Sequence, residues 1–231
     1  MEFKHENISA VLYRMGRPYI DGYKPRGNYQ AALKTAIEEY LAVHPDVTRA
    51  LHGGLDAPVD APPDGSKKRI AEIEVPPPES TPKDLKKRDG PRSGRKTDWA
   101  GSDAANRKLG GQGEQFVFDL ERHHLKEIGR ADLAARVEWT ARDRGDGLGY
   151  DIRSFDEDGR EKSIEVKTTN GPKSMPFLLT ATELECAEEL KAGYWIYRLF
   201  RFGTDVGLFR ICGPLEDRLE LRPKLFVATL R

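Results

Sequence analysis

The stretches Gly149-Tyr150-Asp151-Ile152 and Ile164-Glu165-Val166-Lys167-Thr168 decide the fold that this sequence predicts. In each stretch polar and apolar residues alternate, which is typical of a β-strand with one buried face. Side chains alternate along a strand, so Glu165 and Lys167 share one face while Ile164 and Val166 point to the other. The two stretches therefore predict a pair of central strands with charged residues on one side.

A turn between these strands brings their acidic residues together. The connecting residues 156–160 are Asp-Glu-Asp-Gly-Arg, a composition typical of a hairpin turn in which Gly159 takes a positive φ. A hairpin folded about Asp158 places Asp151 directly opposite Glu165, with Cβ atoms about 5 Å apart. Two carboxylates in this arrangement repel each other unless a cation lies between them, so the pattern predicts a metal site. The alternative is a solvated face of an antiparallel pair, where an exposed ion pair contributes little to stability.

The same residues supply the parts for hydrolysis of a phosphodiester. Hard divalent cations such as Mg²⁺ or Mn²⁺ prefer oxygen ligands, which Asp151 and Glu165 provide. A metal held there polarises a phosphoryl oxygen and lowers the pKa of a bound water. Lys167 places an ammonium group where negative charge develops in the transition state. The pattern therefore predicts a metal-dependent nuclease with Asp151, Glu165 and Lys167 in its catalytic site.

An ordered set of motifs extends beyond these two strands. Its members are 106–110 (Asn-Arg-Lys-Leu-Gly), Gly113-Glu114, 149–152, 164–169, and Thr180 with Glu183. On these residues the chain from about residue 98 to its C-terminus resembles the C-terminal domain family of the plant protein NO VEIN. The pattern Asp151…Glu165-x-Lys167 also resembles the PD-(D/E)xK motif of the restriction-endonuclease-like nucleases, with Tyr150 where the motif name has proline.

The resemblance implies an activity, a substrate and a further site residue. It implies a Mg²⁺-dependent endonuclease that acts on DNA in preference to RNA. The arrangement of a small helical module, a linker and then a nuclease domain suggests a role in bacterial restriction or phage defence. The resemblance also implies that Glu114, near the start of a helix expected over 112–128, is a third metal ligand. The alternative for Glu114 is an acid favoured by the helix dipole, which contributes roughly 0.3–1 kcal/mol. Glu121, two turns further on nearly the same face, is the substitute for Glu114.

The expected order of elements agrees with that superfamily. The elements are a helix over 112–128, strands over 137–140, 150–155 and 163–168, a helix from the capping box at 180–183 to about 191, and strands over 194–202 and 206–211. The first six of these elements follow the αβββαβ order of the superfamily. We therefore expect an α/β (α+β) fold, with a restriction-endonuclease-like core whose mixed central sheet is flanked by helices.

Composition divides the chain into three parts. Residues 1–53 are expected to form a small helical module, with a helix over 30–43. Residues 54–101 are rich in proline, glycine and basic residues, and we expect a disordered linker. This linker is either a spacer or an arm in which Lys86, Lys87 and Arg88 add salt-dependent contacts to phosphates. Residues 102–231 are expected to form the nuclease domain.

Global composition limits the partners and the location. The 231 residues include 38 basic and 38 acidic side chains, so contacts to nucleic acid must come from local patches. No apolar run is long enough to span a membrane, the N-terminus is unlike a signal peptide, and there are two cysteines. We expect a cytoplasmic protein with no membrane partner.

Two questions of assembly and activity stay open at the level of sequence. Cleavage of both strands by a protein with one site favours a homodimer or a partner subunit. The alternative function is a non-catalytic nucleic-acid-binding or protein-interaction module on the same fold.

Overall fold

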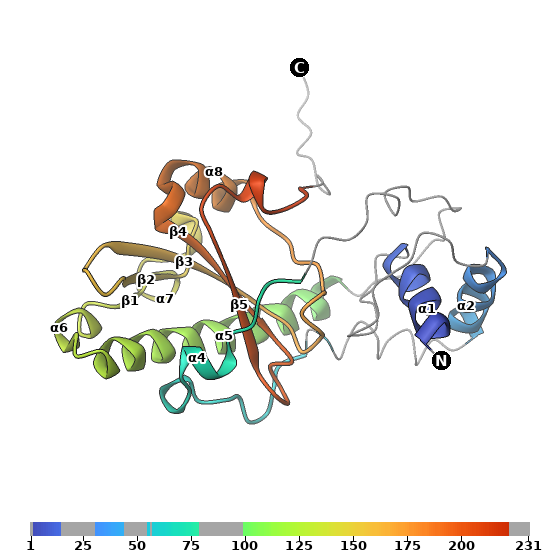
Figure 1. The fold of residues 1–231 in the computed structure, drawn as a ribbon, viewed down its shortest axis with the longest axis horizontal. Coiled ribbons are helices and arrows are strands. Elements are labelled where there is room, and N and C mark those ends of the chain that lie inside the picture. Colours follow the sequence, from blue (N-terminus) through green and yellow to red (C-terminus); the bar gives the residue numbers. More distant parts are fainter. Residues whose placement is uncertain (1, 15–30, 44–54, 56, 79–98, 222–231) are drawn as a thin grey trace, which may run out of the picture.

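One mixed β-sheet organises the molecule (Figure 1). The computed structural model describes residues 2–14, 31–43, 55, 57–78 and 99–221. The strands are β1 (Glu138–Trp139), β2 (Ile152–Phe155), β3 (Glu161–Thr168), β4 (Tyr194–Phe200) and β5 (Gly207–Cys212), and they lie side by side in that order. The β3–β4 pair is parallel and the other three pairs are antiparallel. A mixed sheet of this kind confirms the expected α+β class.

Helices cover both faces of the sheet. The long helix α5 (Trp99–Glu127) crosses one face, and α8 (Ala181–Leu190) covers the other as the connection between β3 and β4 (Figure 1). Parallel neighbours need such a crossover, because a tight turn cannot join them. The sheet separates two cores: Ile164 and Val166 of β3 pack on the α5 side, whereas Tyr194 and Ile196 of β4 pack on the α8 side.

The expected elements are found at or near their expected places. The shorter elements of the same region are α6 (Ala131–Ala134), α7 (Thr140–Arg144), η3 (Asp146–Leu148), η4 (Lys191–Gly193) and η5 (Leu215–Asp217). The largest difference is α5, which begins at Trp99 rather than near residue 112. Glycines at 110, 111 and 113 lower the helix propensity of this part by about 1 kcal/mol each, so local pattern did not predict it.

The central hairpin has the predicted geometry. Ile152 pairs with Ile164, and the strands are joined by a turn in which Gly159 has φ +87°. The Asp156 N–H donates to the Arg160 carbonyl at 2.8 Å, and the Gly159 N–H donates to the Asp156 carbonyl at 3.0 Å. These bonds centre the turn on residue 158, so the register that the sequence predicted is confirmed.

Residues 57–78, called the strap below, pack against this domain. Ile70 and Ile73 of the short helix α4 (Ile70–Ile73), which follows η1 (Gly65–Lys67), are buried in the α5-side core. The Val59 backbone and the Gln112 side-chain amide exchange two hydrogen bonds of 2.9 and 2.6 Å. Glu74 forms a parallel bridge with Leu208. The expectation of a disordered linker over 54–101 is therefore wrong for residues 57–78, because distant apolar and polar partners order this segment.

Two further expectations concern the N-terminal part of the chain. The expected helix over 30–43 is confirmed as α2 (Ala31–Val43), and α1 (Glu2–Arg14) precedes it. The predicted phosphate contacts at Lys86, Lys87 and Arg88 lie outside the described residues. Within the described parts of the chain, no helix is both long and apolar enough to cross a membrane.

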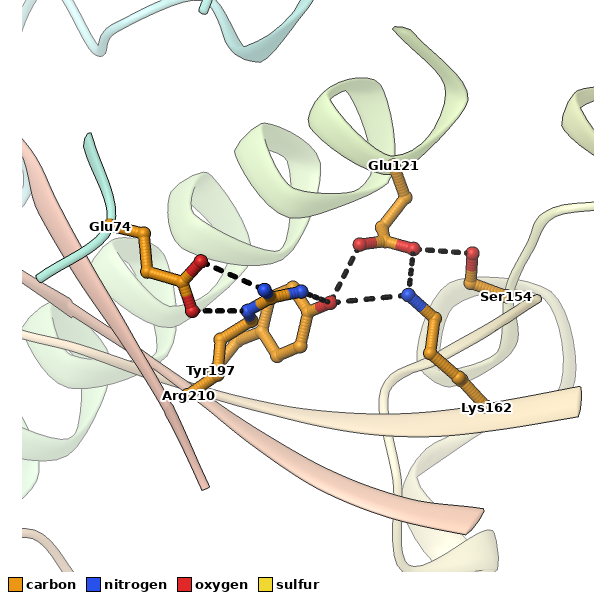
Figure 2. A network of polar contacts seen from close by, with 6 residues as sticks. All are labelled: Glu74, Glu121, Ser154, Lys162, Tyr197 and Arg210. Carbon is orange, nitrogen blue, oxygen red and sulfur yellow. Dashed lines mark hydrogen bonds and ion pairs between the residues drawn. The ribbon is translucent and has the colours of Figure 1, made fainter. Parts of the chain in front are cut away.

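A buried polar network connects α5 to the sheet (Figure 2). Glu121 is fully buried, and its carboxylate lies 2.8 Å from the Lys162 ammonium. Ser154 and Tyr197 donate hydrogen bonds of 2.6 and 2.7 Å to the same carboxylate. Burial alone would raise the pKa of Glu121, but Lys162 and the two hydroxyls hold that pKa below its ordinary value. Glu121 is thus fully engaged inside the core.

This network also reaches the strap. Arg210 of β5 donates to the Tyr197 hydroxyl at 3.3 Å and forms a two-pronged ion pair with Glu74 at 2.7 and 2.8 Å (Figure 2). Glu74 and Arg210 are separated by more than half the chain in sequence. Paired N–H···O bonds of this kind are among the stronger polar contacts in proteins. They fasten the end of the strap to the sheet.

Candidate functional site

The predicted site residues meet at a pocket of about 400 Å³. It lies where the N-terminal half of α5 passes the carboxyl end of β3, and Glu114, Asp151, Glu165 and Lys167 all line it. The structure therefore brings together the four residues that sequence predicted for the catalytic site. Glu121, the substitute for Glu114, does not line this pocket but lies in the buried network described above.

A glycine sets how closely α5 approaches the sheet. An added Cβ at Gly113 would lie 1.8 Å from the Thr168 hydroxyl oxygen and 2.9 Å from its Cβ. No side chain fits there without separating the helix from the strand. Gly113 thereby places its neighbour Glu114 beside the end of β3. The indole N–H of Trp139 donates to the Glu114 carboxylate at 2.9 Å and orients it.

Asp151 is held by the backbone of β3. It lies just before β2, and its own N–H donates to the Ile164 carbonyl at 2.9 Å. Its Oδ2 accepts a hydrogen bond of 2.7 Å from the Val166 N–H. Continuing the register of the hairpin by one residue places Asp151 opposite Glu165. The Asp151 side chain is thus fixed against β3, the strand that carries Glu165 and Lys167.

Burial and neighbouring charge perturb both acids. Burial raises the pKa of Asp151, and the nearby charge of Glu114 raises it further. Burial also raises the pKa of Glu165, and the charge of Asp151 adds to that effect. Both carboxyl groups are therefore easier to protonate than ordinary ones. Clustered, desolvated acids of this kind are typical of functional sites, because a structural role is served at lower cost by uncharged residues.

Lys167 lies between two carboxylates. Its Nζ is 2.7 Å from Glu165 Oε1 and 2.9 Å from Glu183 Oε2, and its side chain is 17% exposed. Burial lowers the pKa of Lys167, but the charges of Glu165 and Glu183 outweigh it, so the pKa is raised above its usual value. Lys167 therefore remains protonated at neutral pH, and it lines the pocket.

The site residues offer oxygen ligands for a cation. Among the residues that the structure describes, no three or more histidine, cysteine, aspartate or glutamate side chains are arranged to hold a metal ion. Asp151 and Glu165 form an opposed pair, and Glu114 lines the same pocket from α5. Mg²⁺ is commonly bound by one or two carboxylates together with water and substrate phosphate. The donor chemistry of Asp151 and Glu165 fits that mode of binding.

Sequence reasoning missed two residues of the pocket region. Glu183 was expected to be only part of a capping box, which the structure confirms with Thr180, but Glu183 also contacts Lys167. Arg198 of β4 is buried, lines the pocket and is the strand neighbour of Lys167. A single charge within the otherwise apolar run 194–200 was the available signal for Arg198.

Comparison with known proteins assigns the family. Residues 113–211 match the model of the family described as Protein NO VEIN, C-terminal. That range runs from Gly113 in α5 to Ile211 in β5 and contains most of the sheet together with α8. The domain formed by these residues therefore belongs to the NO VEIN C-terminal family, as its motifs predicted. Searches of curated proteins and of solved structures found no match.

Proposed function

We propose that this domain is a metal-dependent nuclease of the PD-(D/E)xK superfamily. The observation that supports it best is the opposition of Asp151 and Glu165 across the central hairpin, with Lys167 next on the same face. Both acids are desolvated, and the charge of Asp151 raises the pKa of Glu165 further. A divalent cation bound between the two carboxylates would offset the cost of burying them close together.

Asp151 and Glu165 would hold Mg²⁺ or Mn²⁺, with Glu114 assisting from α5. When bound, the cation supplies Lewis-acid stabilisation of phosphoryl charge and a more acidic water. The backbone of Val166 keeps the Asp151 carboxylate in place, and Trp139 does the same for Glu114. Few reorganisations are then needed when substrate arrives, which favours catalysis.

Lys167 contributes positive charge to the transition state. Its ammonium group is fixed at the edge of the pocket by two ion pairs rather than being free in solvent. A preorganised donor in a partly buried site stabilises developing negative charge much more than the same donor in water. Arg198, the strand neighbour of Lys167, adds a second positive charge on this side of the pocket.

We further propose DNA as the substrate and restriction or phage defence as the role, with a homodimer or partner subunit for cleavage of both strands. The superfamily likeness supports DNA as the substrate, the arrangement of a helical module before the nuclease domain supports the defence role, and a single site per chain supports a dimer or partner. Arg107 and Lys108 are exposed on α5 next to the pocket-lining residue Asn106, so phosphate contacts are available there.

The test is cleavage of a substrate panel in Mg²⁺, in Mn²⁺ and in EDTA. The panel contains plasmid DNA, single-stranded DNA, phage DNA with modified bases, and structured RNA. We expect metal-dependent cleavage by the wild type that Lys167→Ala lowers about 100-fold or more, the range for loss of one charge-stabilising donor. Lys126→Ala, which changes an exposed lysine of α5, is the matched control and should cleave normally.

The panel also separates the alternatives. DNA binding without cleavage in any metal would favour a non-catalytic binding module on the same fold. Equal cleavage by wild type and Lys167→Ala would locate the activity elsewhere or in a contaminant, and the proposed site would be rejected.

A further inference from the structure

The capping box of α8 is physically connected to the proposed site. Oε2 of Glu183 accepts a hydrogen bond of 3.1 Å from the Thr180 N–H, and the Thr180 hydroxyl accepts one of 3.2 Å from the Glu183 N–H. The same Oε2 lies 2.9 Å from Lys167 Nζ. One carboxylate oxygen thus serves both the start of a helix and the lysine of the motif.

A cap alone does not require a charge at this position. Glutamine completes a capping box as well as glutamate does, because either side chain can accept the backbone N–H at the N-cap. The ion pair with Lys167 is the contact that specifically uses the negative charge of Glu183. Its side chain is 13% exposed, so solvent weakens this ion pair less than it weakens a surface pair.

Glu183 provides Lys167 with a second ion-pair partner besides Glu165. Glu165 is the other partner of Lys167, at 2.7 Å, and under the proposed function it is also a metal ligand. When the Glu165 carboxylate binds a metal cation, its ion pair with Lys167 becomes weaker. The Glu183 carboxylate is fixed by the Thr180 N–H at the start of α8. It can therefore keep its ion pair with Lys167 whether or not Glu165 binds a metal.

We propose that Glu183 is a positioning residue that keeps the Lys167 ammonium group aimed into the pocket. This inference rests on the proposed function for its effect on catalysis, although the placement of Lys167 can be measured without it. Glu183 acts through Lys167 and does not itself touch the substrate.

Two variants of the full chain separate positioning from capping. Glu183→Gln keeps an acceptor for the Thr180 N–H but removes the charge that faces Lys167. Thr180→Ala removes the hydroxyl of the cap but leaves the Thr180 backbone N–H and the Glu183 carboxylate in place. We expect Glu183→Gln to lower kcat about 10- to 100-fold, the range seen when a residue that orients a site group is lost.

KM, the thermal midpoint and a double variant provide further tests of positioning against capping. KM for Glu183→Gln should stay within about twofold of wild type, since only the chemical step is affected. Thr180→Ala should keep the wild-type kcat and lower only the thermal midpoint. Adding Glu183→Gln to Lys167→Met should have no further effect, because both changes act through one interaction. Wild-type kcat in Glu183→Gln, or an equal loss in Thr180→Ala, would overturn the proposal.

A nuclear magnetic resonance measurement keeps the inference testable if no substrate is cleaved. The ¹⁵Nζ resonance of Lys167, assigned by its loss in Lys167→Met, reports how firmly the ammonium group is held. We expect this resonance to shift or broaden in Glu183→Gln and to be unchanged in Thr180→Ala. That result without cleavage would retain the positioning role and reject the nuclease, whereas an unchanged resonance in Glu183→Gln would overturn the positioning role itself.

Discussion

The Val166 N–H donates a hydrogen bond of 2.7 Å to the carboxylate of Asp151, across the central hairpin. The bond joins the first acid of the site to the strand that carries Glu165 and Lys167. Because the donor is a backbone group, the position of Asp151 depends on strand pairing rather than on a neighbouring side chain. The Val166 side chain itself points to the other face, into the core beneath α5.

Asp151→Asn should separate the charge of this residue from its structural role. Asparagine retains an oxygen that can accept the Val166 N–H, so the fold should be preserved. Loss of one carboxylate should weaken Mn²⁺ binding at least about tenfold, since even residues that only support a metal ligand have effects of that size. Isothermal titration calorimetry measures the change, with circular dichroism as the check on folding. An unaltered titration would count against metal binding at Asp151.

Stability of the metal-free protein should fall as pH rises. Burial raises the pKa of Asp151 and of Glu165, so the folded state holds these protons more tightly than the unfolded state does. Stability is then highest below the unfolded values of about 4 and is lost as pH rises through the raised folded values. Urea unfolding in EDTA between pH 5 and pH 9 should show this loss, with a smaller loss in Asp151→Asn.

Divalent cations should reverse that trend. Protons and cations compete for the same carboxylates, so added Mg²⁺ should raise the midpoint of unfolding more at pH 8 than at pH 6. An equal stabilisation at both pH values, or the same stabilisation in Asp151→Asn, would show that the cation binds elsewhere.

The same change at two glutamates of α5 should affect different properties, stability at Glu121 and metal binding at Glu114. Glu121→Gln leaves Lys162 buried without its counter-charge, which is expected to lower the free energy of unfolding by about 3–5 kcal/mol. Glu114→Gln keeps an oxygen for the Trp139 indole and should leave stability nearly unchanged while weakening metal binding. Chemical denaturation and calorimetry on both variants check this contrast. Similar effects of the two changes on metal affinity would contradict it.

The strap should contribute measurably to the stability of the domain. Ile73 is 7% exposed and packs in the α5-side core, so Ile73→Ala should lower the free energy of unfolding by about 2–5 kcal/mol. Glu72→Ala, at the exposed neighbouring position, should change it by less than about 0.5 kcal/mol. Equal effects in thermal or urea unfolding would mean that the strap is not part of the folded core.

Local signals in the sequence were sufficient for the hairpin and for the start of α8. Alternation of residue type, turn residues around Gly159 and the Thr180–Glu183 capping box each act over a few residues, and the structure has all three. The placement of Asp151 opposite Glu165 followed from the same local register. These features were predictable because neighbours in sequence create them.

Long-range partners account for what sequence did not predict. The strap contains few apolar residues, and its order depends on Gln112 and Arg210, which are far away along the chain. The role of Glu121 depends on Lys162, whose side chain leaves β3 on the face opposite to Lys167. Alternation along β3 predicts that Lys162 and Lys167 point to opposite faces. It does not predict which lysine is buried, because that depends on Glu121 of the packed helix α5.

The strap has a practical consequence for expressing this domain. The family match begins at Gly113, whereas the buried residues Ile70 and Ile73 and the first turns of α5 precede it. A fragment cut at the limits of sequence similarity would lack part of its own core and expose the apolar surface of α5 to water. Inactivity or aggregation of such a fragment would report incomplete folding, and boundaries for expression are better placed before residue 55.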